Sequence, residues 1–71
     1  MSEIKAPMAG NIWKINVQVG QEINFGDEVI IIMESMKMEI PVEADDTGIV
    51  KEIRVSENDN VDDGHILIIL Q

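Results

Sequence analysis

An internal repeat with an offset of 38 residues restricts the fold of this chain more than any other feature of the sequence. When the first half is shifted onto the second, glycines fall on glycines and aliphatic residues fall on aliphatic residues. The aligned pairs are Gly10 and Gly48, Ile12 and Val50, Ile15 and Ile53, Val17 and Val55, Ile23 and Val61, Gly26 and Gly64, Val29 and Leu67, and Ile31 and Ile69. Because turn and core positions repeat together, we expect two copies of one strand–turn–strand unit. Neither copy could bury its own apolar face, so the two should pack into one sandwich with pseudo-twofold symmetry.

The apolar pattern of the chain predicts strands and gives no sign of helices. From Ile12 to Val19 every second residue, beginning with Trp13, is apolar. This alternation indicates a half-buried strand with Trp13 packed on the core. The aliphatic run from Val29 to Met33 indicates a strand covered on both faces. No segment shows a sustained period of 3.6 residues with helix caps, so the fold class is predicted to be all-β.

Shorter strands are predicted around these two. They cover residues 2–5, 40–44, 50–55 and 66–70, and glycine- or asparagine-containing turns separate them. Pro41 cannot donate a ladder hydrogen bond, so its strand should lie at a sheet edge or carry a bulge.

The composition bounds both the size of the protein and its chemistry. With 71 residues the chain is expected to form one domain, residues 1–71. It has no cysteine for disulfides, and its single histidine excludes a histidine-rich metal site. Since Trp13 and Phe25 are its only aromatic residues, aliphatic side chains must fill the core. We expect the domain to be a monomer in isolation.

The charge of the chain argues against two classes of partner. Its formal net charge is −9, and no two of its basic residues are adjacent. Nucleic-acid backbones and anionic membrane surfaces are therefore not expected to bind it. The apolar runs are far shorter than the roughly 20 residues that span a bilayer. The start, Met-Ser-Glu-Ile-Lys, has no signal-peptide core, so a cytoplasmic location is expected.

The link between the two copies, residues 34–40, is predicted to lie at one end of the molecule. Under the pseudo-twofold symmetry this link falls opposite the two chain ends. Lys37 stands in its middle, between Met36 and Met38. The symmetry alone therefore places a lysine at a tip of the domain.

Two stretches resemble the biotinyl/lipoyl attachment domain family. The sequence Glu-Ser-Met-Lys-Met at residues 34–38 resembles the Glu-Ala-Met-Lys-Met signature of biotinyl domains, with Ser35 in place of alanine. Ala-Pro-Met-Ala-Gly at residues 6–10 resembles their Ala-Pro-Met-x-Gly opening in pyruvate-carboxylase-type enzymes. The resemblance covers essentially the whole chain. It implies a flattened eight-stranded sandwich with the modified lysine on a tight hairpin between strands four and five.

The resemblance also implies a function. Lys37 would be biotinylated by a biotin protein ligase, and the biotin would carry a carboxyl group from a biotin carboxylase to a carboxyltransferase. The domain would catalyse nothing itself. No inserted segment interrupts the repeat between Gly10 and Ile31, which favours pyruvate- or propionyl-CoA-carboxylase-type relatives. The Met-Ser start is typical of a free-standing attachment protein.

The residues around Lys37 admit several interpretations. Met36 and Met38 could fill the core, but at a tip we expect them to be exposed and to contact a ligase. Lipoyl domains are similar in having a glutamate three residues before their modified lysine and a glycine eleven before it. Glu34 and Gly26 match this pattern, so lipoate attached to Lys37 by lipoyl-attaching enzymes is the alternative cofactor, or a second one in a chain that accepts both. The Met-Lys-Met sequence favours biotin.

Plainer interpretations exist for the same residues. Lys37 could be an ordinary solvated lysine of an unmodified interaction module. Glu34 could be a solvated acid, and Gly26 could simply be the turn glycine equivalent to Gly64. The acidic segments around residues 43–46 and 57–63 do not match a calcium loop and indicate a solvated surface.

Overall fold

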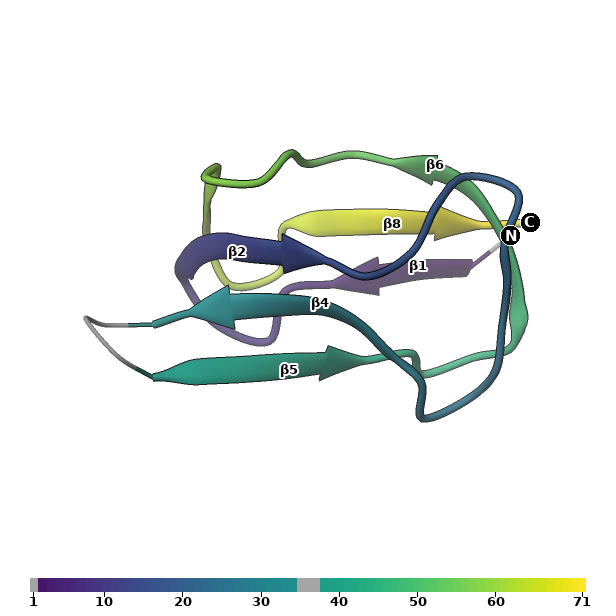
Figure 1. Ribbon diagram of the computed structural model, residues 1–71, viewed down its shortest axis with the longest axis horizontal. Coiled ribbons are helices and arrows are strands. Elements are labelled where there is room, and N and C mark those ends of the chain that lie inside the picture. Colours follow the sequence, from purple (N-terminus) through teal and green to yellow (C-terminus); the bar gives the residue numbers. More distant parts are fainter. Residues whose placement is uncertain (1, 35–37) are drawn as a thin grey trace.

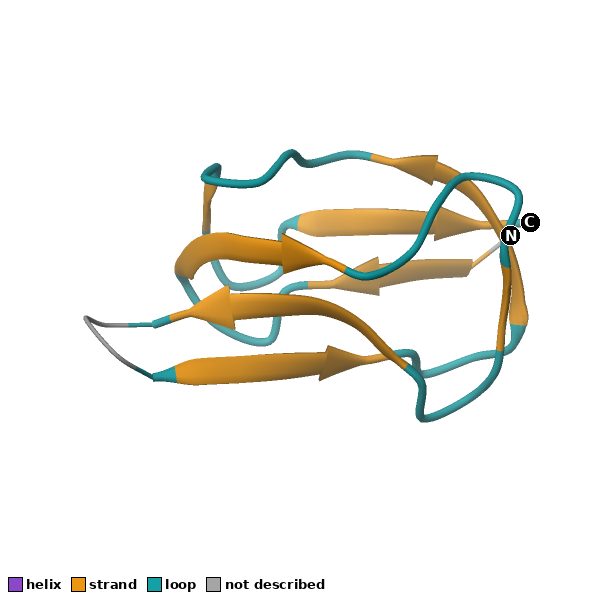
Figure 2. Cartoon of the chain, viewed as in Figure 1, coloured by secondary structure: helices purple, strands orange, loops and turns teal. Residues whose placement is uncertain are grey.

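The computed structural model describes residues 2–34 and 38–71. Within these ranges every regular element is a β-strand (Figure 2), which confirms the predicted all-β class. The strands are β1 (Ser2–Lys5), β2 (Gly10–Ile15), β3 (Glu22–Ile23), β4 (Glu28–Met33), β5 (Glu39–Glu43), β6 (Gly48–Ile53), β7 (Asn60–Val61) and β8 (Ile66–Leu70). The described ranges accordingly contain no helix that could cross a membrane.

The strands form two antiparallel four-stranded sheets that face each other (Figure 1). One sheet has the order β1-β8-β6-β3 and the other the order β5-β4-β2-β7. Replacing each strand by its repeat equivalent, four places along the chain, converts one order into the other. The predicted pseudo-twofold symmetry is therefore confirmed. Each sheet takes two strands from each half of the chain, so neither half forms a sheet alone.

Backbone hydrogen bonds between the halves repeat in the same way. The N–H of Ala44 donates to the carbonyl of Asp27, and the N–H of Gly26 donates to the carbonyl of Ala44, both at 2.8 Å. The symmetry-equivalent bonds run from the N–H of Ala6 to the carbonyl of His65 and from the N–H of Gly64 to the carbonyl of Ala6, also at 2.8 Å. These bonds satisfy backbone groups where the chain leaves the ladders, and each joins one half of the chain to the other.

The core between the sheets is entirely aliphatic. Among the described residues no polar or charged residue is buried. The buried residues are Ile4, Ala6, Ile12, Val17, Ile23, Val29, Ile30, Ile32, Val42, Ala44, Val50, Val55, Val61, Leu67, Ile68 and Leu70. Burial of this apolar surface is the main force that holds the two sheets together.

The strand predicted from Val29 to Met33 is confirmed, but its predicted cover on both faces is wrong. The run lies within the central strand β4, where Val29, Ile30 and Ile32 are fully buried, whereas Ile31 and Met33 on the outer face are only half-buried. Pro41 lies in β5, the edge strand of its sheet, as its missing N–H requires.

The prediction for residues 12–19 is wrong in three respects, the first being Val19, which was expected on the core face and is 64% exposed. Strand β2 ends at Ile15, and Trp13 is 41% exposed whereas Ile12 is fully buried. The cause is a register shift against β4 between Ile12 and Lys14. A bulge adds one residue to a strand and so reverses the inward–outward alternation beyond it. Trp13 therefore faces outward, with the Lys14 ammonium 5.4 Å from the centre of its ring.

Gly10 occupies the tightest glycine position of the described chain, and replacing it tests the packing of the two strands. A Cβ on Gly10 would lie 2.5 Å from Ile32 Cγ2 and 2.9 Å from the Met33 carbonyl oxygen. The backbone of a central strand cannot move away cheaply, so we expect Gly10→Ala to lower the free energy of unfolding by about 1–3 kcal/mol. Urea denaturation followed by circular dichroism measures this loss.

The repeat-equivalent glycine provides the matched control. A Cβ on Gly48 would lie 3.1 Å from the Gln71 carbonyl oxygen and 3.4 Å from Leu70 Cβ, near the end of the chain. Gly48→Ala should therefore cost less than Gly10→Ala. Equal losses at the two positions would contradict this packing argument.

Candidate functional site

The β4–β5 hairpin carries the stretch that the sequence analysis singled out. The two strands are antiparallel neighbours, and Met33 at the end of β4 lies opposite Glu39 at the start of β5. Beyond this pair the N–H of Glu34 donates to the carbonyl of Met38 at 3.1 Å. The next residues along the chain, Ser35, Met36 and Lys37, lie outside the described residues. Their predicted roles therefore remain predictions, whereas the base of the hairpin is defined.

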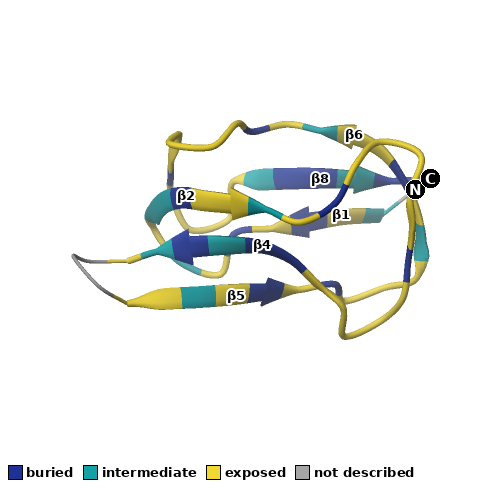
Figure 3. Ribbon diagram, in the orientation of Figure 1, coloured by how far each residue is buried: buried dark blue, intermediate teal, exposed yellow. Residues whose placement is uncertain are grey.

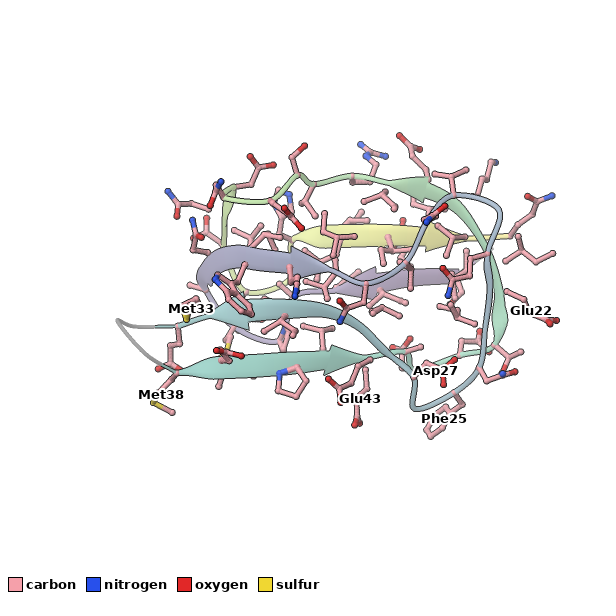
Figure 4. The ribbon with its side chains drawn as sticks, in the orientation of Figure 1. Glu22, Phe25, Asp27, Met33, Met38 and Glu43 are labelled. Atoms are coloured by element: carbon pink, nitrogen blue, oxygen red, sulfur yellow. The ribbon has the colours of Figure 1, made fainter. Side chains whose placement is uncertain are left out.

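The base of the hairpin lies at one end of the molecule. Figure 4 shows Met33 and Met38 at this end, and Phe25 and Asp27 at the other. Figure 1 shows both chain termini at the end away from the hairpin. The residues that flank the link between the halves therefore lie opposite the chain ends, as the pseudo-twofold symmetry predicts.

The side chains at the hairpin base are accessible. Met38 is 55% exposed, so the expectation that it does not fill the core is confirmed. Glu34 and Glu39 are exposed as well (Figure 3), while Met33 is half-buried. A modifying enzyme can therefore reach this end without unfolding the sandwich. Whether Glu34 and Met38 contact such an enzyme stays a prediction.

Gly26 does not lie with the other predicted site residues. It belongs to the turn between β3 and β4, and β4 runs from this turn to the hairpin base at the far end (Figure 1). Its φ is +92°, and the equivalent Gly64 has a φ of +85°. A Cβ on either glycine would meet no atom within 4 Å other than those of its chain neighbours. The positive φ thus explains why glycine occupies position 26 in this turn, whether or not a modifying enzyme also recognises it.

Other chemistry is sparse in the described part of the chain. It contains no group of three or more histidine, cysteine or acidic residues placed to bind a metal ion. An open hollow is lined by Arg54, Gly64, His65 and Ile66, none of which is buried. The β4–β5 hairpin is therefore the strongest candidate for the functional site among the described residues.

Comparison with known proteins identifies the family. The model of the biotin/lipoyl family, described as "Biotin-requiring enzyme", matches residues 2–70. This chain belongs to the biotin/lipoyl family. The resemblance inferred from the two sequence motifs is thereby confirmed, and the observed sandwich agrees with it.

Small relatives of similar length are found in bacteria. A "Biotin/lipoyl attachment protein" of Bacillus subtilis is 51% identical over 65 residues, which cover 92% of this chain and 88% of the relative. A "Biotinylated protein TB7.3 homolog" of Mycobacterium leprae is 35% identical over 68 residues, covering 96% and 94%. Members of the family that consist of little more than this domain therefore exist.

A larger enzyme contains the same domain. The crystal structure of the urea carboxylase of Kluyveromyces lactis superposes with a TM-score of 0.88 and 33% sequence identity. The match covers 99% of this chain but 6% of that enzyme. This chain thus corresponds to one small part of that carboxylase.

Replacing Gly26 and Gly64 by alanine tests their shared backbone role. Both variants should lower the free energy of unfolding by about 1–2 kcal/mol, because a Cβ is disfavoured at positive φ even where space is open. Gly26→Asn should lose less, since Asn58 adopts a φ of +77° in this chain. Chemical denaturation measures all three, and a loss confined to one of the two glycines would contradict their equivalence.

Proposed function

We propose that this chain is a biotin carrier, covalently biotinylated on Lys37, that moves carboxyl groups between a biotin carboxylase and a carboxyltransferase. The observation that carries the proposal is the exposed base of the β4–β5 hairpin, with Glu34 and Met38 on either side of a segment that contains Lys37. The family match and the biotinylated relative of Mycobacterium leprae support it.

Attachment would proceed through an activated acyl group. The Lys37 amine attacks the carbonyl carbon of biotinyl-adenylate, an amide C–N bond forms, the C–O bond to the phosphate breaks and AMP leaves. The amine must lose its protons, and an unperturbed lysine has a pKa of about 10.4, so the ligase has to assist the deprotonation. The product is a neutral amide with a long flexible stem.

The contribution of the sandwich to carboxyl transfer would be presentation. In this proposal the domain itself would supply no catalytic group. A tethered biotin reaches two active sites in turn at a high effective concentration, and diffusion of free biotin between them is avoided. An aliphatic core without buried polar groups suits a rigid support of this kind.

A lipoyl carrier modified on the same lysine is the second candidate. Glu34 and Gly26 match the spacing found in lipoyl domains, and the Bacillus subtilis relative bears both cofactors in its name. The two functions differ in the attached group and in the partner enzymes. Both require a hairpin whose lysine a modifying enzyme can reach.

Intact-mass spectrometry of protein made in cells with both biotin- and lipoate-attaching enzymes tests the proposal. We expect a biotin-sized increment on the wild-type chain and none on Lys37→Arg. The variant should melt within a few degrees of the wild type, because the predicted place of Lys37 at the tip of the domain would give it little packing to lose. A lipoyl-sized increment would favour the second candidate, and an unmodified chain would point to an interaction module without a cofactor.

Gly26→Ser separates the two attachment enzymes. We expect this variant to lose more lipoylation than biotinylation if a lipoate-attaching enzyme reads the glycine. The measurement is the initial rate of each modification on the folded variant, with Gly64→Ser as the control for the strain at positive φ. Equal losses of the two modifications would contradict a recognition role for Gly26.

A further inference from the structure

The two halves of this protein act as an internal control for each other. Their strands, register shifts and positive-φ residues recur at equivalent places in both sheets. The same backbone is thus built twice, with different side chains on its outer surface. A residue type that appears on only one of the two equivalent outer faces is not demanded by the fold.

The outer face of the β5-β4-β2-β7 sheet carries an apolar patch next to the hairpin base. We call it the hairpin-side patch, and it consists of Trp13, Ile31, Met33 and Pro41. Ile31 pairs with Pro41 on β5, and the register against β2 places Trp13, the bulge residue, beside the Lys14–Ile31 pair. Trp13 and Pro41 are exposed, while Ile31 and Met33 are half-buried.

The equivalent positions on the other outer face are mostly polar. Lys51 stands at the position of Trp13, Gln71 at that of Met33 and Glu3 at that of Pro41, and all three are exposed. Only the position of Ile31 stays apolar, as Ile69. One equivalent pair differs the other way: the hairpin side has the polar Asn11 where the other face has the apolar Ile49. The Asn11 side-chain amide donates hydrogen bonds to the Asn58 carbonyl and to Asn60 Oδ1. Three apolar side chains on the hairpin side thus have no structural necessity.

Acidic residues lie along the hairpin and edge-strand side of the hairpin-side patch, while the exposed Lys14, which pairs with Ile31, lies on its β2 side. Glu34, Glu39 and Glu43 are exposed along the hairpin and its edge strand, within a chain of net charge −9. An apolar centre with a charged rim is the usual anatomy of a specific protein interface, and tryptophan and methionine are enriched in such centres. The acidic rim calls for a partner with basic side chains around an apolar surface.

We propose that the hairpin-side patch is the docking surface for the ligase that acylates Lys37. The inference rests on the proposed function. Met33 belongs to the patch and pairs with Glu39 at the hairpin base, one residue from the Glu34–Met38 hydrogen bond. An enzyme that covers the hairpin base on this side of the sheet also covers the patch.

The distance between the domain and the enzyme's active site favours the ligase over the carboxylases as the partner that contacts the patch. Before modification the acceptor is a lysine amine in the three-residue segment between Glu34 and Met38, so the ligase has to approach the hairpin base itself. After modification the biotin stem extends further, and a carboxylase can take up the cofactor with less contact to the sheet. The surface that needs an apolar contact next to the hairpin is therefore the one that the ligase uses.

The test copies the second half of the chain onto the first. The triple variant Trp13→Lys, Met33→Gln and Pro41→Glu introduces residues that the equivalent backbone already carries, and it leaves the net charge at −9. Phe25→Ser is the matched control, because Phe25 is 75% exposed and lies at the opposite end (Figure 4). Circular dichroism and thermal melting verify the fold, and Met33→Gln alone serves if the triple variant melts early.

The readout is ligase kinetics with the carrier as the varied substrate. We expect KM to rise about tenfold or more in the triple variant with little change in kcat, since docking contacts act equally in the ground and transition states. Phe25→Ser should keep the wild-type KM. Titration of the ligase with Lys37→Arg protein, with and without the three changes, should give the same loss of affinity without any chemistry.

Each other outcome has a distinct meaning. Wild-type and triple-variant chains that are modified with the same KM overturn the docking inference and leave the proposed function intact. A wild-type chain that the ligase never modifies overturns both. A triple variant with normal ligase KM but impaired carboxyl transfer assigns the patch to a carboxylase subunit, and a dimer that only the wild type forms assigns it to a second copy; either result overturns the ligase assignment.

Discussion

The structure depends on the mutual burial of two sheets, each of which contains strands from both halves of the chain. β8 pairs with β1, and β4 pairs with β5, so the central strands bind the opposite half through their ladders. Within residues 2–34 and 38–71, sixteen buried aliphatic residues fill the space between the sheets. A domain of this size buries a smaller share of its surface than a large one, and interlocking lets every strand contribute to the same core. The hairpin that links the halves is supported on one side, where β4 pairs with β2, while β5 forms the edge of the sheet.

Symmetry in this protein explains the fold, and departures from symmetry point to function. The core positions recur as aliphatic residues because both halves face the same interior. The outer positions are free to differ, since solvent covers them in both halves. Trp13 against Lys51 and Met33 against Gln71 are such differences, and both bring apolar groups to the hairpin side. The link between the halves has no equivalent at all, because the chain ends occupy its place.

The sequence was sufficient for most of the fold and for the location of the candidate site. Period-two patterns and turn glycines indicate the strands, and the motif around Lys37 indicates the same family as the match over residues 2–70. Nothing in the pattern revealed the bulge after Ile12, because a bulge depends on the pairing of β2 with β4 and not on β2 alone. Trp13 was therefore assigned to the core although it is 41% exposed.

By itself, then, the sequence determined the duplicated all-β architecture, the aliphatic core and the presence of one lysine midway between the repeats, because these follow from residue type and spacing. Only the tertiary structure decided which outer residues share a surface. It separated Gly26 from Glu34 by the length of β4, and it joined Trp13, Met33 and Pro41 across three strands. Neighbourhood across a sheet is set by strand order and register, which form only when the two halves of the chain meet.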